Sequence, residues 1–358
     1  MLLTPADPRL AFFAPQPTDR NRPEIRLDRF PAAAHTACVG RIGPLANLRS
    51  SSGCAVQLIT DSPWVELHLA RLRHHQPSPC GIAAEILGSG ARTVSESPDL
   101  RARDGDVRVR LATGLERGGP PAEVRLWLPA ISTCALAGVE LADGAVAASA
   151  RPLTPRWLVL GDSLAQGFIA QSPLDGWVAR LAARWNAPAW NLGVGGLGIM
   201  TEVFRWALDA RRWELVVIAL GSNHAWNDAE ADRAGDCAEA LAEIALAGGH
   251  GRVVWLEPPW KCLDDGHGPA AFQGVPLDPK AAHRIARIRA DLHDRLAPLA
   301  PRLEWITDLM PHDPRLLPDG LHPQAAGFAQ MAARLADRLA DRLAEGLGNL
   351  APDPRVSF

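Results

Sequence analysis

The chain has 358 residues, 47% of them hydrophobic, which is enough apolar material for more than one core, and we expect two domains. A net charge of −3 leaves no basic surface for phosphate backbones, so we expect no nucleic-acid partner. No apolar run reaches the length of a membrane span, and the early run at residues 10–14 is too short for a signal peptide. We therefore expect a soluble, cytoplasmic protein.

The cysteine pattern argues against a metal site and against a disulfide-stapled fold. No CxxC pair and no paired metal-ligand spacing occurs among the six cysteines. We expect most of them to be small core residues, at positions 38, 54, 80, 134, 237 and 262.

The first half of the chain alternates apolar and polar residues with a period of two. Residues 65–69 and 107–111 show the alternation most clearly, and residues 123–129 and 136–141 continue it, with Gly- and Pro-rich turns between the runs. This pattern predicts an antiparallel β-sandwich domain over residues 37–150. Residues 1–36 are Pro-rich, and we expect an irregular leader there.

The second half alternates short apolar runs with helical stretches after a small, polar linker at residues 142–155. We expect a parallel-sheet α/β domain over residues 151–358. Reactive groups in such sheets gather at the carboxyl ends of the strands. The predicted strands are 157–160, 188–192, 215–220, 252–256 and 303–306, and the predicted helices are 175–186, 199–212, 228–247, 278–296 and 324–346.

Polar residues follow several of these predicted strands. Ser163 comes directly after the first strand, in "WLVLGDSLAQGF", and before a helix, which it could simply cap. The second strand leads to Gly196, where a bare backbone N–H can approach a ligand, and the third leads to Asn223. Near the end of the chain, Asp319 stands three residues before His322, close enough to accept a hydrogen bond from its ring. A serine, an oriented histidine and two N–H donors are the groups that acyl transfer needs.

These four segments resemble the four sequence blocks of the GDSL, or SGNH, hydrolase family over residues 157–345. The matching stretches are Gly161 to Leu164, Asn191 to Gly196, Gly221 to Asn223, and Asp319 to His322. The resemblance implies a flavodoxin-like sheet. The first domain more faintly resembles the β-sandwich that precedes this domain in relatives of carbohydrate acetyl esterases, through "EVRLWLPAISTCALAGVEL".

The resemblance also implies roles for individual residues. Ser163 would be the nucleophile, His322 the base and Asp319 the group that orients the base. The oxyanion hole would consist of the Ser163 and Gly196 backbone N–H groups and the Asn223 amide. The family usually has Asp after the third-block Asn, but this chain has His224, which could face the substrate or bond to the loop backbone.

Further candidate substrate contacts come from loops beyond the strand ends. Trp226 and Trp260 could line a pocket for a sugar face or an acyl chain, or could fill space beneath their own loops. Glu257 and Lys261 share the loop of Trp260 and are weaker candidates.

Four other features of the sequence bear on different kinds of site. "GVGGLG" at 193–198 fits GxGxxG, but it follows the second strand of the domain and no acidic residue ends the next strand, which argues against a dinucleotide. No serine fits the GxSxG elbow of α/β-hydrolases. The polar loop "DDGHG" at 264–268 lacks a second ligand pair, and Cys262 lacks a base.

The expected function is that of a serine esterase which hydrolyses a carboxylic ester through an acyl-enzyme. The expected substrate is a small-molecule or saccharide ester, foremost an O-acetyl or other short acyl group on a carbohydrate. This chemistry needs no cofactor and no metal. The alternatives are a lipase- or thioesterase-type acylhydrolase and a catalytically inactive glycan-binding relative. The oligomeric state is left open.

Overall fold

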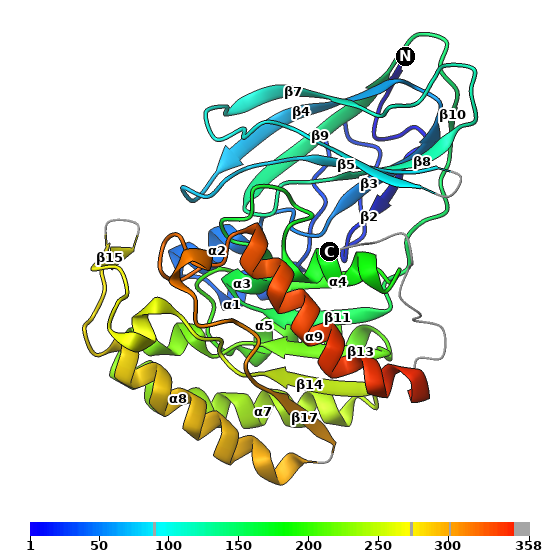
Figure 1. The fold of residues 1–358 in the computed structure, drawn as a ribbon. Helices are drawn as coiled ribbons and strands as arrows, with labels where there is room; N and C mark the ends of the chain where they lie inside the picture. The colour runs from blue at the N-terminus through cyan, green and yellow to red at the C-terminus, as the bar shows by residue number, and fades with distance from the viewer. Residues whose placement is uncertain (89–90, 273–274, 301, 347–358) are drawn as a thin grey trace.

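The chain folds into an antiparallel β-sandwich that lies against one end of an α/β domain (Figure 1). This arrangement is that of a computed structural model, which describes residues 1–88, 91–272, 275–300 and 302–346. Residues 347–358, the end of the predicted third segment, lie outside the described residues. Both predicted architectures, the antiparallel sandwich and the parallel α/β sheet, are confirmed.

The sandwich consists of two antiparallel sheets around one apolar core. Residues at every second position of β7 and β8, and of β4 as far as Leu69, point into this core, as the period-two pattern predicts. The first sheet has the order β1 (Leu2–Leu3), β9 (Ser132–Leu141), β4 (Trp64–His74) and β7 (Gly105–Ala112). The second has the order β10 (Ala147–Ala148), β3 (Ala55–Thr60), β8 (Ala122–Trp127), β5 (Ala83–Leu87) and β6 (Arg92–Glu96), and β2 (Ala11–Phe13) also pairs with β3.

The first 36 residues are more ordered than the expected irregular leader. Strands β1 and β2 join the two sheets of the sandwich. Helices α1 (Ala32–Ala37) and α2 (Ile42–Leu48) contribute Ala34 and Leu48 to the core of the α/β domain instead. Strands of two or three residues are too short to show a period, which is why the sequence pattern missed them. The predicted borders at residues 36 and 150 remain predictions.

The α/β domain has a five-stranded parallel sheet in the order β12, β11, β13, β14, β17. This order, 2-1-3-4-5 in sequence, is the flavodoxin-like one. Alternate residues of β11 pack into different cores, Leu158 on one face of the sheet and Val159 on the other. Because both faces are buried, the sequence of this strand is an unbroken apolar run. The strands are β11 (Trp157–Gly161), β12 (Ala189–Gly193), β13 (Leu215–Ala219), β14 (Arg252–Leu256) and β17 (Leu303–Ile306).

Helices cover both faces of this sheet. On one face lie α5 (Thr201–Ala210), α7 (Ala234–Ala247) and α8 (Ala281–Leu296), and on the other lie α4 (Trp177–Arg184) and α9 (Ala325–Gly346). The predicted helix 228–247 is divided into α6 (Asp228–Asp232) and α7, with Arg233 between them. Short elements fill the loops: α3 (Ser163–Gln166), the 3-10 turns η1 (Ser222–Trp226), η2 (Cys262–Asp265), η3 (Ala297–Leu299) and η4 (Pro314–Leu316), and the hairpin β15 (Ala271–Phe272) and β16 (Val275–Pro276).

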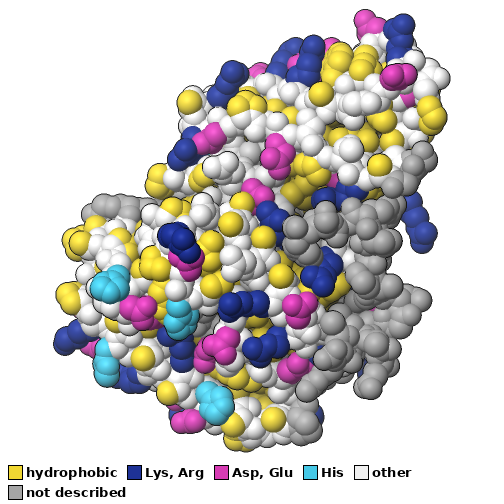
Figure 2. Space-filling model, viewed as in Figure 1, with side chains coloured by type: hydrophobic (Ala, Val, Ile, Leu, Met, Phe, Trp, Pro, Cys, Tyr) yellow, Lys and Arg dark blue, Asp and Glu magenta, His cyan; other side chains and the backbone are white. Residues whose placement is uncertain are grey.

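Charges of both signs are interspersed on the face of the molecule seen in Figure 2, as the small net charge of −3 suggests. Within the described residues, no helix combines the length and the apolar character needed to cross a membrane.

A buried arginine ties the N-terminal segment to the α/β domain. Arg29, which lies between β2 and α1, is 1% exposed. At 2.7 to 3.2 Å its guanidinium donates to the backbone oxygens of Asn47, Ser50, Asn191 and Gly193, and to the Ser50 hydroxyl. All five acceptors are neutral, and burial lowers the pKa of Arg29 to about 10. One cation therefore joins the chain before β3 to strand β12.

Replacing this arginine should destabilise the whole molecule. In Arg29→Met, the buried carbonyl groups of Ser50, Asn191 and Gly193 lose their donor, at about 1–3 kcal/mol each when no water replaces it, while Asn47 keeps its bonds to Ser50. We expect the free energy of unfolding to fall by at least about 3 kcal/mol, measured by urea denaturation with tryptophan fluorescence. The control is Arg26→Met, since Arg26 lies on the same segment but is exposed. Equal stability of the two variants would contradict the role of Arg29.

Candidate active site

Ser163 lies at the carboxyl edge of the parallel sheet, directly after β11. The strand ends at Gly161, and the Asp162 carboxylate caps α3 by accepting the Leu164 N–H at 3.0 Å. Burial raises the pKa of Asp162, and the nearby positive charge of Lys261 acts in the opposite direction. Ser163 is the first residue of α3 and is 7% exposed. A nearly buried hydroxyl at this edge is positioned to meet groups from the neighbouring strand ends.

Two glycines allow the short helix α3 to pack closely against the sheet. A Cβ at Gly161 would lie 2.3 Å from the Ala165 Cβ, and a Cβ at Gly193 would lie 2.2 Å from the backbone N of Gln166. Any side chain at either position would push α3, and Ser163 with it, away from β11 and β12.

His322 and Asp319 approach Ser163 from the far end of the chain. The His322 Nε2 lies 2.9 Å from the Ser163 Oγ, and its Nδ1 lies 2.8 Å from the Asp319 Oδ2. Because an ionised carboxylate only accepts, Nδ1 carries the proton, and Nε2 of a neutral ring is then an acceptor for the hydroxyl. The structure thus brings together the three residues that the sequence suggested.

The Asp319 carboxylate is held by several donors. Its Oδ1 accepts the backbone N–H groups of Leu321 and His322 at 2.9 and 2.7 Å. Burial raises the pKa of Asp319, but the His322 ring and these N–H groups together bring it below its ordinary value. The carboxylate is therefore ionised at neutral pH and fixes the orientation of the ring.

The two other predicted donors follow the strands on either side of β11. Gly161 pairs in register with Gly193 on β12 and with Ala219 on β13, so the loops after these strands begin beside Ser163. Gly196 lies in the first loop with φ +78°. Asn223 lies in η1, and its Nδ2 donates to the Leu197 oxygen at 3.0 Å. The loops that carry the candidate oxyanion donors are therefore joined to each other.

His224 differs from the expected substrate contact. The side chain is 2% exposed, its Nε2 accepts the Ile199 N–H at 2.8 Å, and its Nδ1 donates to the Glu230 oxygen at 2.8 Å. Burial lowers the pKa of His224. With both nitrogens bonded to backbone, the ring joins loops, which is the alternative that the sequence left open.

The remaining candidates are one exposed, one buried and one half-buried side chain. Trp226 is 38% exposed, and its Nε1 donates to the Asn223 Oδ1 at 3.1 Å. Trp260 is 8% exposed, stacks on His312 with ring centroids 4.9 Å apart, and bonds to Asp265, so it fills space in its own loop region. Burial raises the pKa of Glu257, and the charges that act on it are Arg289, Asp308 and His293 rather than the Ser163 and His322 pair.

Two phenylalanines beside the histidine were not predicted. The rings of Phe168 and Phe272 lie 4.7 and 5.3 Å from the His322 ring, and 6.1 Å from each other. Phe168 follows α3, and Phe272 belongs to the β15–β16 hairpin. Neither lies in a periodic segment, so only the fold reveals that they crowd the candidate base.

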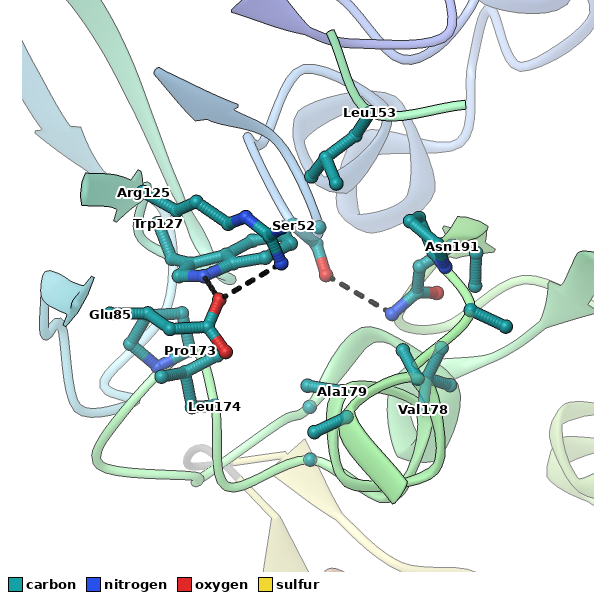
Figure 3. Close-up of a pocket in the computed structure, with 18 of the residues that line it drawn as sticks. Ser52, Glu85, Arg125, Trp127, Leu153, Pro173, Leu174, Val178, Ala179 and Asn191 are labelled. Atoms are coloured by element: carbon teal, nitrogen blue, oxygen red, sulfur yellow. Dashed lines mark hydrogen bonds and ion pairs between the residues drawn. The ribbon is translucent and has the colours of Figure 1, made fainter. Parts of the chain in front are cut away.

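A cavity of about 590 Å³ lies between the sandwich and α4, and Ser163 does not line it (Figure 3). Trp127, Leu153 and Pro173 form parts of its wall, together with small residues of α4. Its buried carboxylate, Glu85, is already bonded to the Trp127 Nε1 and to Arg92. The Glu85 carboxylate is therefore already paired within this wall.

One cluster of potential metal ligands occurs among the described residues. Ligand atoms of Glu66, His68 and Glu140 lie within 4.8 Å of one another on the first sheet of the sandwich. The His68 Nε2 is 2.9 Å from Glu140, and Arg110 lies 2.9 Å from Glu66. These contacts lie within the sandwich and involve no residue of the candidate active site.

Comparisons with solved structures extend over both domains. A salicylyl-acyltransferase from a tetracycline biosynthetic pathway matches with a TM-score of 0.74 and 18% identity, covering 97% of this chain and 98% of that one. A protein described as a GDSL-like lipase from Bacteroides ovatus also has a TM-score of 0.74, with 16% identity and coverages of 96% and 98%. A family two carbohydrate esterase from Clostridium thermocellum, solved with cellohexaose, has a TM-score of 0.61, with 13% identity and coverages of 94% and 99%. These likenesses establish the two-domain fold.

The family comparison concerns the α/β domain. A comparison with curated proteins gave no match. Residues 159–330 match the GDSL-like lipase/acylhydrolase family, and this segment contains Ser163, Asn223 and His322. The resemblance of the α/β domain to the GDSL-like lipase/acylhydrolase family, expected from the four sequence blocks, is therefore confirmed over residues 159–330.

Proposed function

We propose that the protein is a serine esterase that removes a short acyl group, foremost acetyl, from a carbohydrate through an acyl-enzyme. The observation that carries the proposal is the contact series Asp319, His322, Ser163, with distances of 2.8 and 2.9 Å. This series provides an oriented base in hydrogen-bond reach of a hydroxyl nucleophile, which serine acyl transfer requires.

The proposed reaction has two symmetrical halves. His322 takes the Ser163 proton while the Oγ bonds to the ester carbonyl carbon, and the carbonyl π pair moves onto its oxygen. As that pair returns, the bond to the sugar oxygen breaks, and His322 protonates the leaving alcohol. Water then loses a proton to His322, bonds to the acyl carbon and displaces the Ser163 oxygen, which regains the proton as the acid leaves.

The negative oxygen of each intermediate needs donors that are already in position. We assign this role to the backbone N–H groups of Ser163 and Gly196 and to the Asn223 amide. The bond from Asn223 to the Leu197 oxygen supports the assignment, because it couples the Asn223 side chain to the loop of Gly196.

The short acyl group is supported by the crowding of His322. Two phenylalanine rings within 6 Å of the imidazole leave little space on that side for a long chain. The carbohydrate part rests on likeness to proteins described as family two carbohydrate esterases and as an acetyl xylan esterase.

The likeness to an acyltransferase indicates a second candidate function, in which the acyl group passes to an acceptor other than water. The salicylyl-acyltransferase matches this chain over 97% of its length. In an acyltransferase, an alcohol or amine takes the place of the deacylating water, and the first half of the reaction is unchanged. Product analysis in the presence of added alcohols separates hydrolysis from transfer.

We also propose that the protein is located in the cytoplasm. All six cysteines are free thiols, which suits a reducing compartment.

Removing the nucleophile or the base should abolish catalysis without unfolding the protein. We expect Ser163→Ala and His322→Ala each to lower kcat on p-nitrophenyl acetate by about 10⁴-fold or more. Both variants should also lose labelling by a serine-reactive fluorophosphonate. An unlabelled, inactive wild-type protein that still binds acetylated glycans would instead identify a non-catalytic binding relative.

Acyl length should separate the acetyl esterase from a lipase or thioesterase. On a series of p-nitrophenyl esters, we expect kcat/KM to be highest for acetate and to fall at least about tenfold by octanoate, a loss that one or two kcal/mol of steric conflict explains. Replacing Phe272 with Ala should flatten this profile, while Phe12→Ala in the sandwich should leave it unchanged. A maximum at long chains would contradict the proposed substrate.

The neutral state of His224 should make stability depend on pH. Since burial lowers the pKa of His224 in the folded protein, the unfolded chain binds a proton at a higher pH than the folded one. The contribution of His224 is therefore present above about pH 6.5, the ordinary histidine pKa, and is lost as pH falls below it. We expect the free energy of unfolding to fall less between pH 7 and 5 in His224→Gln than in the wild type.

The matched control for His224 is His267→Gln, since His267 is exposed. His35, His75 and His250, whose pKa values burial also lowers, are present in all three proteins and cancel in the comparison. An unchanged pH slope in His224→Gln would show that its ring is not held neutral.

A further inference from the structure

We propose that Trp226 is a positioning residue that holds the Asn223 amide in the orientation needed to stabilise the oxyanion. This inference rests on the proposed function, in which Asn223 is an oxyanion donor. It assigns to the indole N–H, rather than to the ring face, the principal role of Trp226.

The orientation of an asparagine amide is decided by what its oxygen and nitrogen meet. The Asn223 Oδ1 accepts from the Trp226 Nε1 at 3.1 Å, and the Asn223 Nδ2 donates to the Leu197 backbone oxygen at 3.0 Å. An indole N–H can only donate, and a backbone carbonyl can only accept. A flipped amide would set donor against donor and acceptor against acceptor, so one orientation is strongly preferred.

This orientation leaves one Nδ2 hydrogen available. An amide nitrogen carries two hydrogens, and Leu197 takes one of them. The second is the hydrogen that an oxyanion at Ser163 can receive. Because the donor is fixed before the substrate arrives, stabilising the intermediate requires no reorientation of the amide.

The backbone segment that carries the Trp226 indole is anchored by an arginine on α8. Arg284 on α8 is 3% exposed and donates to the backbone oxygens of Ala225 and Trp226 at 3.3 and 3.5 Å. The same guanidinium bonds to Asp228 and Asp278 at 2.6 and 2.7 Å. The backbone of η1 is therefore fixed through α8, and the indole extends from a rigid support.

Burial does not explain the presence of this tryptophan. Its ring is 38% exposed, and it is the one aromatic residue among the exposed large hydrophobic side chains of the described chain. The hydrogen bond to Asn223 and a stacking surface for substrate are two different reasons for a tryptophan here. They make different demands, because only the first needs the indole nitrogen.

Trp226→Phe separates the two reasons, since phenylalanine keeps a ring and loses the N–H. We expect kcat on p-nitrophenyl acetate to fall about 3–10-fold, well short of the 10²–10³-fold loss expected for Asn223→Ala, with KM within about twofold. A stacking role alone predicts the reverse: normal kinetics in Trp226→Phe and a raised KM in Trp226→Ala. Unchanged kcat in Trp226→Phe would overturn the proposal.

The control is Trp206→Phe on α5. It removes an indole bond to the Val203 oxygen that is 2.9 Å long, at a residue outside the proposed machinery, and should leave kcat unchanged. Equal losses in both variants would show a general effect of tryptophan removal and would also overturn the proposal.

A second measurement does not depend on activity. The chain has seven asparagines, so selective ¹⁵N-asparagine labelling gives few side-chain NH₂ signals, and Asn223→Ala identifies that of Asn223. We expect Trp226→Phe to shift this signal and to speed its exchange with solvent. An unchanged signal overturns the positioning role even if the enzyme proves inactive, whereas failure of the proposed function appears separately as an unlabelled Ser163.

Discussion

The buried guanidinium of Arg29 is the constraint that fixes the segment before β3 against strand β12 of the α/β domain. A buried cation with five neutral oxygen partners cannot leave them without leaving buried carbonyl groups short of a donor. Two of these partners, Asn191 and Gly193, belong to β12, and the others precede β3. Gln166 and Asn47 add bonds to the N–H and the oxygen of Gly195. The loop of Gly196 is thus braced from the N-terminal segment and from α3 together.

The candidate site shows how a parallel sheet gathers distant residues. Ser163 and His322 are 159 positions apart in the chain, yet their side chains are 2.9 Å apart. β11 lies between β12 and β13, so the loops after these strands flank Ser163, while the loop before α9 delivers His322 from the other side. Phe168 and Phe272 then exclude solvent from the imidazole ring. The low polarity of this environment strengthens the hydrogen bonds of the series.

Neutral side chains connect the two loops that carry the candidate oxyanion donors. Where relatives usually have an acid after the third-block asparagine, His224 accepts the Ile199 N–H and donates to the Glu230 oxygen. Trp226 and Leu197 hold the two ends of the Asn223 amide. A buried carboxylate could accept but could not donate, so it could not replace both bonds of His224. His224 therefore changes how the third loop is anchored, while the loop still carries Asn223.

The sequence by itself determined the two fold classes and the groups Ser163, Asp319 and His322, because strand periodicity and short-range spacing are local properties. It also indicated the strand ends at which Gly196 and Asn223 lie. Only the tertiary structure decided that His224 is buried between loops, that Trp260 stacks on His312, and that Phe272 lies against His322. It likewise revealed Arg29, whose partners lie up to 164 residues away. The physical reason is that a hydrogen bond or a ring contact across the fold leaves no trace in the pattern of neighbouring residues.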